Sequence, residues 1–116
     1  MIELVDEQTI QQMIEDTSAD VMPMLIDEYV DETQQRIHKI EHAFSNQDCA
    51  LLEFESHALG SSALALGNRA LSMLARKIEH LCMDDQQETA LSYQEEFVLL
   101  ANSSLNAIIN RKQQGF

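Results

Sequence analysis

The chain has 116 residues, of which 45 % are hydrophobic, and this fits one folded domain rather than a disordered segment. Its 3 Gly and 1 Pro are too few for the many turns of a β-sandwich or barrel, so we expect an all-α fold. The formal net charge of -13 disfavours binding to nucleic acid and to anionic membranes, and it favours a soluble monomer.

Two helices are predicted in the first part of the chain. A brief amphipathic helix is expected over 7–14, with Asp6 as its N-cap. A long helix follows over 21–44, because apolar side chains recur there at intervals of three and four residues, and Pro23 is tolerated in its first turn. The polar residues 45–48 supply a turn and a cap for the next element.

A helical hairpin is predicted in the middle of the chain. Its first helix covers 49–66 and ends at Gly67, because glycine readily adopts the left-handed conformation found after helix C-termini. Asn68 is expected to cap the second helix, which covers 69–83.

The last predicted helix covers 88–112, after a turn at residues 84–85. Four long helices joined by short polar turns predict an antiparallel up-and-down four-helix bundle with a short additional N-terminal helix. No linker, repeat or low-complexity tract divides the sequence, so residues 1–116 are expected to form a single domain.

The cysteines and the apolar runs indicate the compartment. Cys49 and Cys82 have no metal-type spacing, and the sequence has neither a disulfide framework nor a signal-peptide pattern. The longest apolar runs are only a few residues, too short to span a membrane. We therefore expect a cytoplasmic protein.

The segment 57–67 departs from an ordinary core helix. Gly60 lies inside a predicted helix, where glycine costs about 1 kcal/mol relative to alanine. Because residues three and four positions apart share a helix face, Gly60 and Ser61 lie beside His57, and Leu64 lies one turn further along. Small neighbours leave the imidazole on a low surface that another protein can approach closely.

The charge distribution singles out the same region. Between positions 56 and 78 there is no acidic residue, yet three of the seven basic residues lie there: Arg69, Arg76 and Lys77. Folding the hairpin about Gly67 places His57 level with Lys77, and positive charge opposite an exposed histidine suits a phosphoryl group. The alternative is that these basic residues are ordinary solvated charges.

A spaced set of residues surrounds His57 in both helices of the hairpin. It reads His57-x-Leu59-x-x-Ser62-x-x-x-Leu66-Gly67, followed by Leu71-x-x-Leu74 and Ile78-Glu79. This pattern resembles the signature of histidine-containing phosphotransfer (HPt) domains, which is His-x-Leu-Lys-Gly-Ser, then Leu-Gly, then Leu-x-x-Leu-Cys-x-x-Leu-Glu. Segment 57–63 is especially similar to stand-alone HPt proteins of bacterial quorum-sensing phosphorelays.

The chain also departs from the family pattern at three places. Gly60 stands where the family carries a lysine, Ser61 where it carries a glycine, and Ala75 where it carries a cysteine. The first of these differences removes a positive charge from the neighbourhood of His57.

The resemblance implies a phosphocarrier rather than an enzyme, with no autokinase activity and no cofactor of its own. His57 would accept a phosphoryl group from an aspartate in the receiver domain of a hybrid sensor histidine kinase. It would then pass the group to the receiver aspartate of a response regulator, and Mg²⁺ would be bound by the receiver partners. Glu79 would orient the imidazole, so that one ring nitrogen stays protonated and the other acts as nucleophile.

Further residues are expected to surround the phosphoryl group and the docked receiver. Lys77 is predicted to be the nearest cation from the next helix, with Arg76 or Arg69 as substitutes, because Gly60 provides no charge. Receiver docking and the phosphate surroundings are assigned to Ala58, Gly60, Ser61, Leu64, Arg69 and Arg76.

Two other functions stay open on the sequence. The chain can be a helical-bundle interaction module that is not phosphorylated, and the glycine at position 60 favours this reading. A metal- or haem-binding bundle is a third possibility, since His38 and His42 have the spacing of a chelating pair on a helix. No further ligands accompany that pair, so we expect no metal site.

Overall fold

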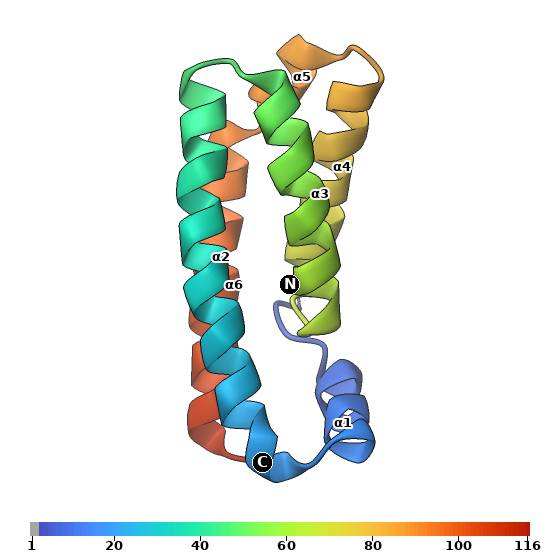
Figure 1. The fold of residues 1–116 in the computed structure, drawn as a ribbon, viewed down its shortest axis with the longest axis vertical. Helices are drawn as coiled ribbons and strands as arrows, with labels where there is room; N and C mark the ends of the chain where they lie inside the picture. The colour runs from blue at the N-terminus through green and yellow to red at the C-terminus, as the bar shows by residue number, and fades with distance from the viewer. Residues whose placement is uncertain (1–2) are drawn as a thin grey trace.

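The computed structural model describes residues 3–116, and the helices within this range pack as a bundle (Figure 1). α2, α3, α4 and α6 lie side by side and alternate in direction, which confirms the expected antiparallel four-helix bundle. The segments are α1 (Glu7–Asp16), η1 (Ala19–Val21), α2 (Met22–Ser45), α3 (Cys49–Ala65), α4 (Arg69–Met83), α5 (Gln87–Leu91) and α6 (Gln94–Gln114).

The core lies between the four long helices, each of which buries one apolar face. The large side chains that are fully buried include Met22, Ile26 and Ile40 from α2, Leu52 and Leu59 from α3, Leu71 and Ile78 from α4, and Phe97 and Ile108 from α6. Their spacing is that of amphipathic helices packed around a shared core. Within residues 3–116, no helix is both long enough and apolar enough to traverse a membrane.

The expected N-terminal helix is confirmed as α1, which closes one end of the bundle. Figure 1 shows it below α3 and α4, beside the lower turns of α2 and α6. Its Ile10 is fully buried, and its Glu7 accepts two hydrogen bonds from the Arg111 guanidinium of α6. Hydrogen bonding to Arg111 holds the pKa of Glu7 below its usual value, which favours the ionised pair.

One expected boundary is wrong. The single helix predicted over 88–112 is two helices, α5 and α6, separated at Ser92 and Tyr93. The Ser92 hydroxyl donates a 2.6 Å hydrogen bond to the Thr89 carbonyl, and such local side-chain bonds compete with continuation of a helix. The other four expected helices agree with the structure to within two residues at each end.

The predicted Asp6 cap is confirmed, and the cap expected within residues 45–48 is Asp48. The Asp6 side chain accepts a hydrogen bond from the Gln8 N–H at the start of α1, and the Asp48 side chain accepts one from the Leu51 N–H at the start of α3. Gly67 has a φ of +88°, the left-handed conformation expected where α3 ends.

Asn68 does not cap α4 with its side chain, contrary to the sequence prediction. Its amide is fully buried instead and donates to the carbonyls of Leu4 and Ser104, at 2.8 and 3.2 Å. It also accepts a 2.7 Å hydrogen bond from the Tyr29 hydroxyl. Burial raises the pKa of Tyr29, so that hydroxyl keeps the proton it donates. The α3–α4 turn is thereby joined to α2, α6 and the N-terminal segment.

We predict that Asn68→Ala lowers the free energy of unfolding by about 1–3 kcal/mol, because buried hydrogen-bonding groups lose their partner. Chemical denaturation measures the effect, with Asn106→Ala on the exposed face of α6 as the matched control. Equal stability of the two variants would contradict a structural role for the Asn68 amide.

Candidate functional site

His57 projects from α3 at the face where α3 meets α4, and 63 % of its side chain is exposed. The residues around it on α3 keep the surface low: Ala58 is half-buried, and the buried Gly60 presents no side chain. Ser61 and Leu64 are exposed on the same face, one and two turns after His57. The imidazole is therefore accessible to another protein.

The orientation of the imidazole is set by Glu79 from α4. His57 Nδ1 lies 2.7 Å from Glu79 Oε2, and Glu79 as a whole is only 7 % exposed. Because an ionised carboxylate can only accept a hydrogen bond, this contact assigns the proton of the neutral ring to Nδ1. Nε2 then carries the lone pair and is free to act as a nucleophile.

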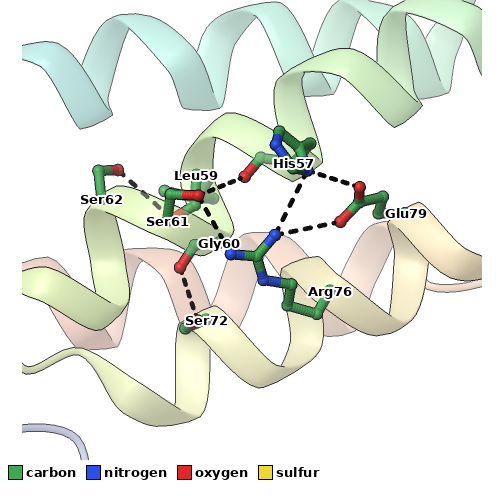
Figure 2. A network of polar contacts seen from close by, with 8 residues as sticks. All are labelled: His57, Leu59, Gly60, Ser61, Ser62, Ser72, Arg76 and Glu79. Atoms are coloured by element: carbon green, nitrogen blue, oxygen red, sulfur yellow. Dashed lines mark hydrogen bonds and ion pairs between the residues drawn. The ribbon is translucent and has the colours of Figure 1, made fainter.

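Arg76 is the basic residue that the fold brings to His57. Figure 2 shows its guanidinium below the ring, between Ser61 and Glu79. Arg76 Nη2 donates to Ser61 Oγ at 3.1 Å, and Nη1 lies 3.4 Å from Glu79 Oε1. Nη1 also lies 3.3 Å from His57 Nδ1, but because the Nδ1 proton points to Glu79, this is a contact between two donors rather than a hydrogen bond.

Lys77 does not occupy the position that the sequence predicted for it. Successive residues of a helix point about 100° apart, so Lys77 leaves α4 in a different direction from Arg76, which is the residue that contacts His57. The Lys77 ammonium lies over the Tyr93 ring instead, with Nζ 5.0 Å from the ring centroid. Arg69, the other substitute considered, lies two turns before Arg76 on α4 and is exposed.

A shallow groove runs along α4 beside the site. Its apolar wall is Leu64, Met73 and Leu81, and its basic residues are Arg69, Arg76 and Lys77. Leu64 and Met73 are 50 % and 66 % exposed, and Phe54, one turn before His57 on α3, is 68 % exposed. Apolar side chains therefore lie on either side of the histidine along α3, which suits a protein-docking surface.

Sequence reasoning missed the residues that fix α3 in place. The buried Ser72 hydroxyl of α4 donates a 2.7 Å hydrogen bond to the Gly60 carbonyl, and Glu55, 4 % exposed, pairs with Arg36 of α2 at 2.8 Å. Glu55 lies two positions before His57 and so points to nearly the opposite side of α3. A small polar residue at position 72, opposite a helix glycine, was the available signal for the first contact.

No cluster of three or more His, Cys, Asp or Glu side chains within residues 3–116 is arranged to hold a metal ion. His38 and His42 are exposed on α2. Cys49 and Cys82 are free thiols, and burial raises the pKa of the Cys82 thiol to about 11, which keeps it in the unreactive protonated form.

The comparisons with known proteins identify the family and the fold of the chain. The family model described as "Hpt domain" matches residues 24–111. No curated protein matches the sequence. Among solved structures, the crystal structure of histidine-containing phosphotransfer protein B (HptB) from Pseudomonas aeruginosa PAO1 aligns over 100 % of both chains, with a TM-score of 0.87 and 16 % identity. That structural match shows a shared fold, and because the family model covers most of the sequence, the chain belongs to the Hpt domain family.

Proposed function

We propose that this protein is a phosphorelay intermediate. His57 accepts a phosphoryl group from a receiver-domain aspartate of a hybrid sensor histidine kinase and passes it to the receiver aspartate of a response regulator. The observation that carries the proposal is an exposed imidazole whose Nδ1 is held by a buried carboxylate, which leaves Nε2 free. Membership of the Hpt domain family supports the same assignment.

The transfer step balances on the groups present. The Nε2 lone pair of His57 forms a bond to phosphorus while the bond from phosphorus to the donor aspartyl oxygen breaks, and the aspartate leaves as a carboxylate. The ring keeps its Nδ1 proton and gains positive charge as the N–P bond forms. Glu79, at 2.7 Å, offsets that charge without having to move.

The receiver supplies the remaining chemistry in this proposal. Its Mg²⁺ and its own side chains would stabilise the transferring group, as metal ions and cations generally do in phosphoryl transfer. The contribution of this chain is an oriented nucleophile on a rigid helix, which reduces the entropic cost of bringing the reacting atoms together. Such a carrier needs no nucleotide site.

Docking would use the apolar side chains along the His57 face. Leu64 and Phe54 flank the histidine along α3, and Met73 continues the surface onto α4. The low surface at Ala58 and Gly60 allows a receiver to bring its aspartate to the imidazole. Desolvated apolar contacts at the centre of an interface supply most of its affinity.

We predict that His57→Gln abolishes phosphoryl acceptance, because the glutamine amide offers no nucleophilic ring nitrogen. Phosphoryl acceptance is measured by incubation with a receiver domain that carries a radiolabelled phosphoryl group, and the label on the wild type should be acid-labile and base-stable. The variant should keep its helical circular dichroism and most of its stability, because the side chain is mostly exposed and the glutamine amide can still donate a hydrogen bond to Glu79. His38→Gln is the matched control, and label that persists on His57→Gln would refute the assignment.

Glu79→Ala should slow phosphoryl acceptance by about tenfold, because the ring loses the bond that fixes its tautomer and direction. Nitrogen-15 NMR of the imidazole measures the tautomer populations. The Nδ1–H tautomer should predominate in the wild type, and its population should fall in the variant. Glu79→Gln keeps an acceptor oxygen and should retain most of the rate, and Glu95→Ala on α6 should change neither quantity. An unaltered tautomer in Glu79→Ala would show that the carboxylate does not orient the ring.

Leu64→Glu should weaken binding of the partner receiver by about tenfold or more, because it places a charge within the apolar docking surface. The control is Leu99→Glu, a similarly exposed leucine on α6 (64 %, against 50 % for Leu64). Isothermal titration calorimetry with the receiver gives both dissociation constants. If the two variants bind equally well, the receiver does not dock on this face.

A further inference from the structure

The Arg76 side chain lies across α3 at the one position of that face where no side chain stands. A Cβ atom added to Gly60 would lie 3.0 Å from Arg76 Nε and 3.2 Å from both Cδ and Cζ. Contacts of 3.0–3.2 Å are closer than nearly all real Cβ contacts, so even an alanine at position 60 would push the Arg76 side chain back by a few tenths of an ångström. The absence of a side chain at Gly60 is therefore what lets Arg76 reach the His57 side of α3.

The guanidinium is held close to the histidine by weak contacts. Its bonds to Ser61 and Glu79 are 3.1 and 3.4 Å long, and 34 % of the side chain remains exposed. Nη1 already lies 3.3 Å from one ring nitrogen, and a phosphoryl group would be attached to the other nitrogen of the same ring. A small rotation of a flexible side chain would bring the guanidinium onto the phosphoryl oxygens, where it can donate two hydrogen bonds.

The other basic residues near the site either contact a different side chain or lie further away. Lys77 sits on the Tyr93 ring, and Arg69 is seven residues before Arg76 on α4. Within the part of the chain that the structure describes, Arg76 is the basic residue that contacts the His57 ring.

We propose that Arg76 binds the phosphoryl group on His57, and that Gly60 and Arg76 work as a pair in which the glycine makes room for the arginine. This inference rests on the proposed function, since it concerns the phosphorylated state of His57. It assigns the cation of the site to α4, and it explains a glycine inside a helix that would otherwise only weaken the fold.

Substitution of Gly60 should change the thermal stability of the bundle and the phosphorylation of His57 in opposite directions. Gly60→Ala should raise the melting temperature, because alanine is the better helix former and the atoms it meets belong to a flexible side chain. The same substitution should lower the share of phosphoryl group held by His57, because it moves the guanidinium away. A glycine needed only for backbone packing would give the opposite stability result.

The proposal is tested by measuring how radiolabelled phosphate distributes at equilibrium between the partner receiver and His57. Arg76→Ala should shift the distribution toward the receiver by about three- to tenfold, a range that allows for solvent screening of an exposed charge, and Gly60→Ala should shift it in the same direction by a smaller factor. Arg76→Lys should recover part of the loss. The double variant Gly60→Lys with Arg76→Ala should recover more than Arg76→Ala alone, because it places a cation one turn after His57.

The control is Lys39→Ala, which removes a basic residue from the exposed face of α2 and should leave the distribution unchanged. An equilibrium that is unaffected by Arg76→Ala, or that responds to Lys77→Ala instead, would overturn the inference. In both cases the wild type still labels on His57, so the proposed function survives. If the wild type does not label on His57, the proposed function itself fails.

Discussion

The close packing of α3 against α4 is the constraint on which the site depends. These two helices form the most extensive pair in the bundle, and the buried Ser72 hydroxyl of α4 donates a hydrogen bond to the Gly60 carbonyl of α3. A wider separation would take the Glu79 carboxylate and the Arg76 guanidinium out of reach of the imidazole. One inter-helix distance therefore sets the tautomer of the histidine and the position of the nearest cation together.

Hydrogen bonds from buried polar groups keep α3 from shifting along its axis relative to the other helices. The Asn68 amide joins the α3–α4 turn to Tyr29 and to two backbone carbonyls, while Glu55 and Arg36 fix the opposite side of α3 to α2. Apolar packing alone tolerates small shifts along a helix axis, whereas hydrogen bonds between specific atoms do not. Such bonds at the hairpin turn and near the middle of α3 hold His57 at one position along the bundle axis.

Much of this molecule could be predicted from sequence because its signals are local. Helix periodicity, two aspartate caps and the glycine turn depend on residues within a few positions of one another, and the signature around His57 lies on one hairpin. The choice between Arg76 and Lys77 could not be settled that way. Counting residues from the turn predicts which α4 residues lie level with His57 along the helix axis, but it does not predict which of their side chains points toward His57. The roles of Asn68 and Ser92 were also missed, since each side chain had a second set of partners that only the folded chain defines.

The uneven charge of the molecule has a consequence for encounters in solution. The chain as a whole carries a net charge of -13, whereas the groove beside His57 is lined by Arg69, Arg76 and Lys77 against one carboxylate, Asp84. The resulting electric dipole would orient a negatively charged partner during diffusion and favour its collisions with the histidine face. The excess of acidic residues away from His57 would then contribute to orienting the partner. The association rate would fall as added salt screens these charges.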